Sequence, residues 1–479
     1  MSKKNQRSTT SILSIIFFLA TLSIHAQQVL VPPYLQPGNS SNLSNEQKIL
    51  IWQTDSIPGH FKVEVSLAKP GEIKTIAKTS VVQLKLKNKT TFLYRATLPK
   101  LKFDSEYSYT ISLNGQPMAE ASFTSRTKEK TTRFAVFGDC GAGTPQQAKI
   151  AYQIYQQKPQ FVLVTGDNVY RSGLENEYRK NFFPYYTAKE ADTLKGAPIM
   201  QTIPFYMLLG NHDVFGADLD KTPDGLAYFY YNDLPLNGPH PKGMVTVKGN
   251  ESLVKAFKSA NGARFPRMSN FSFDYGNVHI VCLDANSYAN PVDPTLVEWL
   301  SNDLKNTKAD WKIVSYHHPG FNSSKAHYDY QYMRLLSPVL EQLGVDLVLT
   351  GHVHNYQRTL PLTFDPKLDS TGTHYAISPE GRVDGKFTLD QSFDGIINTK
   401  PKGIIYIVTG AGGAPLYDLS LSGKPELWKH DPQQNWVPFT TKIVSDIHSF
   451  SMIETNGKKL ILKQLDAKGV AFDEITITK

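Results

Sequence analysis

Residues 161–170 read FVLVTGDNVY, from Phe161 to Tyr170, and this stretch decides the fold. The apolar run before Gly166 is typical of a strand that is buried on both faces. Such a strand brings Asp167 to the carboxyl edge of a sheet, where α/β folds place their functional sites. Asp after Gly is also ordinary turn chemistry, so Asp167 taken alone favours a turn. The same pattern recurs along the chain, however, and each time it ends in a residue type that binds metal ions.

Five predicted strands end in side chains that can ligate a metal ion. They end in Gly138-Asp139-Cys140-Gly141, Gly166-Asp167 with Tyr170, Gly210-Asn211-His212-Asp213, His317-His318-Pro319 and Gly351-His352-Val353-His354. Carboxylates, an amide carbonyl and imidazoles form a mixed oxygen and nitrogen set that suits borderline metal ions. The set is larger than one tetrahedral ion needs. The sequence therefore predicts two ions about 3.5–4 Å apart, with one carboxylate bridging them.

The motif series GDCG, GDNVY, GNHD, HHP and GHVHNYQR resembles that of the calcineurin-like metallophosphoesterases. A Tyr three residues after the bridging Asp is similar to the purple acid phosphatases, and the N-terminal β-module is similar to that of their larger plant-type members. The resemblance implies an α/β fold, a four-layer α/β/β/α sandwich, preceded by an all-β fibronectin type III-like sandwich. It also implies a secreted acid phosphatase that hydrolyses phosphate monoesters by in-line attack of metal-bound hydroxide.

The resemblance implies a role for each site residue. The expected ligands of a ferric ion are Asp139, Tyr170 and His354. The expected ligands of a second, divalent ion (Zn, Mn or Fe) are Asn211, His317 and His352, and Asp167 is expected to bridge the two ions.

Two further histidines match catalytic positions of the family. His212 matches a His that hydrogen-bonds a phosphate oxygen, and His327 matches one that contacts the bound phosphate and the leaving group. His327 as a solvent-exposed residue at a helix start stays open as an alternative. So does His318 in place of His317, although the family ligand stands two residues before Pro. The third motif ends in Asp213 where many members have Glu, and segments 171–203 and 214–270 lack obvious counterparts in the plant pattern.

The chain is predicted to have a signal peptide and two domains. Lys3, Lys4 and Arg7 precede an apolar run that ends near Ala26, which indicates a cleaved secretory signal peptide over residues 1–26 and a secreted or periplasmic protein. Residues 27–127 contain short alternating runs typical of a β-sandwich. Residues 128–479 alternate strands with helical patterns, as stacked α/β layers do. We expect a polar linker over 124–132, a helix over 328–343 and a long loop over 360–400.

Charge and cysteine content narrow the classes of function. Residues 27–127 hold 12 Lys and Arg against 7 Asp and Glu, but no basic-aromatic cluster accompanies them, so no nucleic-acid partner is expected. The two cysteines, Cys140 and Cys282, lie beside apolar runs, which favours buried free thiols, while a single bridge between them stays open.

The expected partners are small phosphate esters. No membrane span is expected in the mature chain, and the sequence does not indicate an oligomeric state.

Two other functions compete with the phosphomonoesterase. A phosphodiesterase or nucleotide-processing enzyme would use the same metal ligands. A binding protein would hold a glycan or polyanion on the β-module and keep only a vestigial metal site, although no ligand position is missing from this sequence.

Overall fold

A computed structural model of the chain describes residues 27–479 except 87–88, 99 and 430–437. The predicted signal peptide, residues 1–26, lies outside the described residues. Within the described part of the chain, no helix combines the length and the apolar character needed to cross a membrane.

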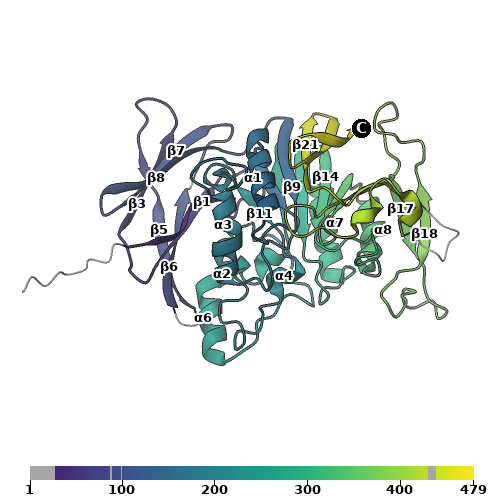
Figure 1. Cartoon of the computed structure of the whole chain (residues 1–479), viewed down its shortest axis with the longest axis horizontal. Helices are drawn as coiled ribbons and strands as arrows, with labels where there is room; N and C mark the ends of the chain where they lie inside the picture. The colour runs from purple at the N-terminus through teal and green to yellow at the C-terminus, as the bar shows by residue number, and fades with distance from the viewer. Residues whose placement is uncertain (1–26, 87–88, 99, 430–437) are drawn as a thin grey trace, which may run out of the picture.

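The N-terminal module is all-β, as predicted, and consists of two four-stranded antiparallel sheets at one end of the molecule (Figure 1). The first sheet has, in spatial order, β1 (Val29–Gln36), β2 (Lys48–Thr54), β6 (Lys89–Leu98) and β5 (Lys78–Leu86). The second has β4 (Thr75–Ile76), β3 (Phe61–Leu67), β7 (Glu106–Leu113) and β8 (Gln116–Thr124). The short alternating runs of residues 27–127 correspond to strands β2, β3, β6 and β7, whereas β1, β4 and β8 were not predicted.

The first sheet of the C-terminal part has six strands. In spatial order they are β11 (Phe205–Met207), β10 (Phe161–Val164), β9 (Thr131–Phe137), β21 (Ser449–Asn456), β22 (Lys459–Asp466) and β23 (Ala471–Thr478). Strands β9, β10 and β11 are parallel, and β21 to β23 extend the sheet in antiparallel fashion. The three parallel strands therefore place their carboxyl ends at one edge.

The second sheet of this part has seven strands. In spatial order they are β12 (Phe271–Tyr275), β13 (Val278–Leu283), β14 (Trp311–Tyr316), β15 (Leu347–Thr350), β19 (Ile405–Thr409), β16 (Tyr356–Thr359) and β20 (Thr440–Val444). Strands β13, β14, β15 and β19 are parallel to one another. Strands β12 and β13 are antiparallel and form a hairpin that turns at Gly276-Asn277.

The two sheets pack face to face and helices cover their outer faces, which confirms the predicted fold class. Ile280 and Cys282 of β13 belong to the core shared with the first sheet, whereas Val281 and Leu283 pack with a separate cluster that includes Leu300 of helix α7 (Pro294–Asn306). This alternation follows from the two-residue period of a strand. The helices are α1 (Pro145–Gln157), α2 (Glu175–Glu177), α3 (Phe183–Tyr186), α4 (Asn211–Val214), α5 (Tyr228–Tyr231), α6 (Glu251–Asn261), α7 (Pro294–Asn306) and α8 (Ser337–Gln342).

The predicted linker over 124–132 is wrong as a solvated connection. Strand β9 already begins at Thr131, and the Arg126 side chain is buried. Its guanidinium pairs with buried Glu46 at 2.5 Å and donates to the carbonyl oxygen of Asp274 at 3.0 Å. A buried ion pair of this kind is costly to break by removing one partner. The polar residues of this segment therefore join the N-terminal module to β12 instead of separating the two parts.

Two further expectations need correction. The helix predicted over 328–343 is shorter: a 3-10 turn covers Tyr332–Leu336 and α8 follows it. The segment 360–400 is not a structureless loop, because β17 (Leu362–Pro366) and β18 (Gly385–Leu389) pair in it as an antiparallel ribbon. Figure 1 shows this ribbon at the end of the molecule opposite the N-terminal module.

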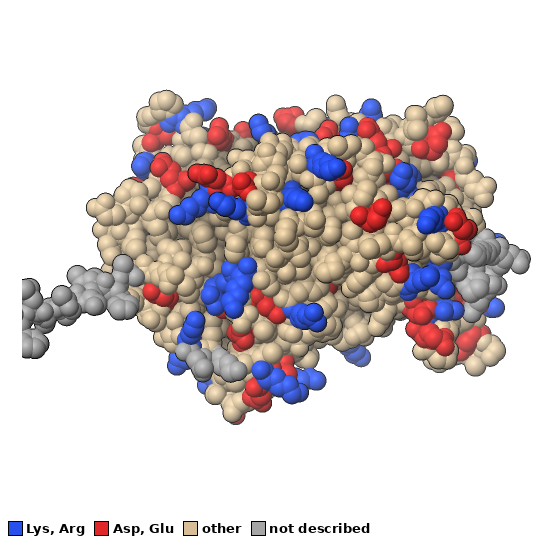
Figure 2. All heavy atoms as spheres, in the orientation of Figure 1, with Lys and Arg blue, Asp and Glu red and all other residues tan. Residues whose placement is uncertain are grey.

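The surface and the cysteines agree with the sequence. On the face drawn in Figure 2, basic and acidic side chains are interspersed. Lys85 of β5 is exposed between buried Leu84 and Leu86, as expected of the solvated side of a strand. Cys140 and Cys282 are both buried and unbonded, which confirms free thiols.

His279 of β13 is buried between two carboxylates. Its Nδ1 lies 2.7 Å from Asp274 Oδ1 and its Nε2 lies 2.9 Å from Asp303 Oδ2. Burial opposes the charged imidazolium, but the hydrogen bonds to Asp274 and Asp303 raise the pKa of His279 to about 9. The folded-state pKa exceeds the unfolded-state value of about 6.5. The pairing therefore stabilises the fold fully when the pH is below about 6.5. The stabilisation is lost as the pH rises through 9.

We therefore expect His279→Gln to lower the free energy of unfolding by about 2–3 kcal/mol at pH 6. The difference from the wild type should shrink between pH 7 and pH 10, because the wild-type imidazole then loses its proton. Urea denaturation at a series of pH values measures this difference. His240→Gln, at an exposed histidine, is the matched control. A deficit that stays constant across the whole pH range would contradict the charged pairing.

Candidate metal centre

The predicted ligands meet where the carboxyl edges of the two large sheets face each other. Asp139 follows β9, Asp167 follows β10, and Asn211 begins α4 after β11. From the second sheet, His317 follows β14, and His352 and His354 follow β15. The main chain joins the two edges, since Gly138 N donates to Thr409 O at 3.0 Å. All five motifs therefore lie at one place in the fold, as the strand pattern predicted.

Local backbone geometry turns the chain sharply where these strands end. Asp139, Asp167 and His352 have φ of 57°, 49° and 67°, in the left-handed region that turns the chain sharply after each strand. Glycine is required at position 210 because the loop that carries Asp167 approaches it closely. A Cβ there would lie 2.1 Å from Asp167 Oδ1 and 2.2 Å from Asp167 N, so only glycine lets the two loops approach so closely.

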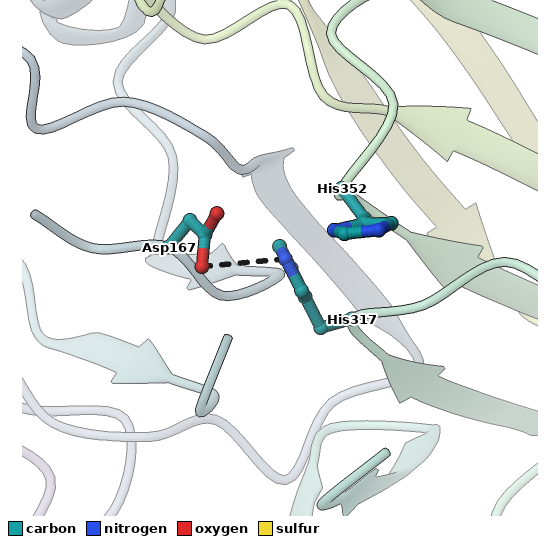
Figure 3. A group of neighbouring side chains, drawn as sticks. All are labelled: Asp167, His317 and His352. Carbon is teal, nitrogen blue, oxygen red and sulfur yellow. Dashed lines mark ion pairs between the residues drawn. The ribbon is translucent and has the colours of Figure 1, made fainter. Parts of the chain in front are cut away.

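The first group of possible ligands contains Asp167, His317 and His352, which lie together between the sheets (Figure 3). One ligand atom from each lies within 4.8 Å of the others. His317 Nε2 is 3.3 Å from Asp167 Oδ1 and 3.1 Å from Asn211 Oδ1. Asn211, predicted to ligate the same ion, therefore also points at this group.

The second group contains Asp139, Asp167 and His354, again within 4.8 Å of one another. The Tyr170 hydroxyl joins it, at 3.2 Å from Asp139 Oδ1 and 3.1 Å from His354 Nε2. Asp167 is the member common to both groups. This is the arrangement expected of a carboxylate that bridges two ions.

The imidazoles present the correct nitrogen for a metal ion. His317 Nδ1 donates to Thr165 O at 2.8 Å and His354 Nδ1 donates to Pro415 O at 2.7 Å, which leaves each Nε2 directed at the carboxylates. Metal-binding histidines are usually oriented by such a hydrogen bond from the other ring nitrogen. His352 Nε2 is buried and has no hydrogen-bond partner in the structure. The residues present therefore fit a metal centre.

The electrostatics of the centre agree with this assignment. Burial, with His318 and His317 beside it, lowers the pKa of His352 well below its ordinary value, so its imidazole is neutral, the form that binds metal ions. For His317 burial acts in the same direction, but the carboxylate of Asp167 outweighs it and raises the pKa to about 9. A metal ion bound to His317 Nε2 would replace the proton that the negative charge of Asp167 stabilises on this nitrogen.

Tyr170 is neutral by the same reasoning. Burial, and next to it the charge of Asp139, raises the pKa of this phenol well above its ordinary value. Only a strongly charged cation bound to the oxygen would displace the phenol proton.

The two predicted catalytic histidines lie beside the centre and not within either group. His212 N donates to Asp167 Oδ1 at 2.9 Å, and its Nδ1 donates to Arg171 O at 2.7 Å. Its Nε2 is 3.9 Å from Asp167 Oδ2. His327, with φ of 56°, lies over His352 with the ring centroids 4.0 Å apart. It does not begin a helix, which removes one of the two alternatives for this residue.

His318 is the alternative ligand that the sequence left open. Its side chain is buried and its ring lies 4.2 Å from that of His352, but the two groups contain His317 and not His318. The geometry therefore favours His317.

Two residues that support the metal ligands, Tyr417 and Asp213, were not given this role in the sequence analysis. Tyr417 stacks on His354 with ring centroids 4.0 Å apart, and no motif near it signals this contact. Asp213 is fully buried and accepts hydrogen bonds from Gly210 N and from Asn168 N and Nδ2, at 2.9, 3.2 and 2.9 Å. Burial raises the pKa of this carboxyl to about 7, with the charge of Asp167 adding to the effect. Asp213 thus fixes the loops that carry Asp167 and Asn211.

Comparisons with known proteins agree with this geometry. Residues 132–356 match the calcineurin-like phosphoesterase family. The resemblance to this family is therefore carried by residues 132–356. That matched range includes all five motifs and runs from β9 to the start of β16.

The relatives carry more specific names. The chain is 26% identical to purple acid phosphatase 21 of Arabidopsis thaliana over 297 residues, which is 60% of this chain and 58% of the relative. It is 23% identical to a purple acid phosphatase of Glycine max over 331 residues, 66% of this chain and 64% of the relative. The match thus spans less than two thirds of the length of these curated relatives. A solved purple acid phosphatase from yellow lupin (Lupinus luteus) seeds has the same fold, with a TM-score of 0.58 at 18% identity, over 93% of this chain and 74% of that one.

Proposed function

We propose that this protein is an acid phosphatase that hydrolyses phosphate monoesters at a centre of two metal ions, Fe(III) and a divalent ion (Zn, Mn or Fe). The observation that carries the proposal is the pair of ligand groups that share Asp167, with the Tyr170 hydroxyl in the second group. The names of the relatives support the same activity.

Each ion would have its own set of ligands from this chain. Asp139, Tyr170 and His354 would hold the ferric ion, and Asn211, His317 and His352 the divalent ion, with Asp167 shared by both. When bound, two cations screen the repulsion between an anionic ester and an anionic nucleophile and lower the pKa of water. Five of these seven side chains are buried, and burial strengthens their interaction with the ions.

The residues beside the centre would bind and orient the ester. His212 is held by hydrogen bonds to Asp167 and Arg171, and its side chain remains 26% exposed, so its Nε2 is available to a phosphate oxygen. His327 lies at the mouth of the centre, where it could give a proton to the leaving oxygen. Burial, with the nearby His354, lowers the pKa of His327.

Hydrolysis of p-nitrophenyl phosphate against its bis ester, with metal analysis of the same preparation, tests the proposal. Two metal ions per chain and a faster rate on the monoester are expected. A faster rate on the bis ester would assign a phosphodiesterase. A protein without stoichiometric metal would be a binding protein with a vestigial site.

We also propose that the chain is exported, with residues 1–26 as its signal peptide, and that residues 27–127 and 128–479 are its two domains. The separate sheets of the two parts support the division. The hydrogen bond from the buried Arg126 side chain to the carbonyl oxygen of Asp274 links the two domains.

His327→Ala is expected to retain both metal ions but to slow turnover, most of all for esters with poor leaving groups. His327 belongs to neither ligand group, and a general acid typically contributes about 10²–10⁴-fold. The measurement is kcat for aryl esters of graded leaving-group pKa, together with metal content. His240→Ala is the matched control, because His240 is exposed and lies outside the groove. An equal loss across the series would restrict His327 to binding or structural support.

A further inference from the structure

A groove of about 650 Å³ opens beside the metal centre and leads away from it. At its inner end lie Asn211, His318, His327 and His352. Its outer part is formed by segments 214–218 and 245–248, in the region without obvious counterparts in the plant pattern, and by Tyr330 and neighbouring residues. A phosphate ester bound at the centre would direct its leaving group into this groove.

Two aromatic side chains stand exposed in the groove. Phe215 is 59% exposed and Tyr330 is 49% exposed, and among the described residues only Tyr375 is another aromatic side chain with comparable exposure. Two of these three therefore line one groove, next to the candidate metal centre. Single exposed apolar residues need no explanation, but two rings gathered at the mouth of a polar site point to a ligand.

Each ring is also held in place by a histidine of the site. Phe215 packs edge-on against His212, with ring centroids 4.9 Å apart. Tyr330 lies 5.7 Å from His327 and 5.8 Å from His352, again between centroids. The hydroxyl of Tyr330 has no hydrogen-bond partner among the contacts described. Both rings are thus positioned by the two histidines beside which the ester would bind, and both keep surface free for a further ring.

We propose that Phe215 and Tyr330 form a subsite for a planar aromatic leaving group, so that the preferred substrates are phosphate monoesters with an aromatic ring near the ester oxygen. The inference rests on the proposed phosphatase function and adds the class of ester. An aromatic ring gains from offset or edge-on contact with other rings, beyond the apolar area that it buries. A saturated ring of the same size gains the buried area alone. The groove therefore distinguishes an aromatic leaving group from a saturated one by the shape and the electrostatics of the ring.

Benzyl phosphate and cyclohexylmethyl phosphate are the probes that isolate this effect. Both release a primary alcohol and both carry a six-membered carbon ring, so leaving-group chemistry and size are closely matched. For the wild type we expect kcat/KM to be about 10-fold higher for the benzyl ester, since each aromatic contact is worth about 3-fold or more. The corresponding non-hydrolysable phosphonates should show the same preference in Kd, measured by calorimetry.

Three variants assign the preference to the two rings. Phe215→Leu and Tyr330→Leu keep apolar bulk but remove the ring, and each should lower the benzyl to cyclohexylmethyl ratio by about 3-fold. Tyr330→Phe keeps the ring and should keep the ratio. Because the ratio is taken within one variant, a general disturbance of His212 or His327 cancels.

The outcomes separate this inference from the proposed function. Hydrolysis of both esters with a ratio that is near one, or that the leucine variants leave unchanged, would overturn the aromatic subsite and leave the phosphatase intact. Hydrolysis of neither ester would contradict the phosphatase, and the Kd values of the two phosphonates would then decide the subsite alone. A benzyl preference in Kd that both leucine variants reduce supports it, and equal Kd values overturn it.

Discussion

Asp167→Ala is expected to lose both metal ions and to lower phosphatase activity more than 100-fold. Asp167 is common to both ligand groups, so its carboxylate would serve each ion and offset the repulsion between them. Removing an outer partner of a metal ligand typically costs about 10–100-fold, and a shared direct ligand should cost more. Metal content by mass spectrometry and hydrolysis of p-nitrophenyl phosphate measure the two effects.

The matched control is Asp365→Ala, because Asp365 is an exposed carboxylate on β17 that belongs to neither ligand group. It should retain two ions and full activity. If Asp167→Ala lost a single ion and kept substantial activity, Asp167 would belong to one ion only, and the assignment as a bridge would be wrong.

Tyr170→Phe is expected to remove the visible absorption of the iron-loaded, oxidised protein while the fold remains. The Tyr170 hydroxyl lies 3.2 Å from Asp139 Oδ1 and 3.1 Å from His354 Nε2, within the group assigned to the ferric ion. A phenol that loses its proton to Fe(III) gives a charge-transfer band, so the wild type should be violet or pink. The substitution removes one oxygen and keeps the ring packed 4.5 Å from His212, between centroids.

Absorption spectra at equal iron content, with circular dichroism for the fold, make this comparison. Tyr417→Phe is the informative control, because Tyr417 stacks on His354 but belongs to neither ligand group, and its variant should keep the band. An iron-replete, oxidised wild type without a visible band would exclude phenolate ligation. A band that persists in Tyr170→Phe would mean that another tyrosine binds the iron.

The sequence predicted the convergence of the five motifs more completely than the rest of the fold. Asp139, Asp167 and Asn211 each follow an apolar strand that is buried on both faces, and this pattern depends on neighbouring residues alone. The glycine that precedes each of these residues was equally visible, although the reason for Gly210, the approach of Asp167, is a contact between distant loops. Parallel strands then bring the motifs to one edge without further information.

The errors have a common physical cause, which is tertiary contact that outweighs local composition. Arg126 lies in a polar run that is typical of a linker, yet it is buried because Glu46, eighty residues earlier, supplies the opposite charge. The groove with Phe215 and Tyr330 carries no motif, and only the folded chain brings these two segments together.

The unbonded cysteines give the proposed centre a second importance, as a cross-link. Exported proteins commonly limit their unfolded state with disulfides, but in this chain, for which export is proposed above, Cys140 and Cys282 are free, and these are its only cysteines. Ions held between Asp139 and His352, which lie 213 residues apart in sequence, would close a loop as long as many whole domains. Closing so long a loop restricts the unfolded chain strongly, and metal binding then contributes directly to folding. The centre would thus hold the two sheets together much as a disulfide does, with its strength set by metal supply instead of redox potential.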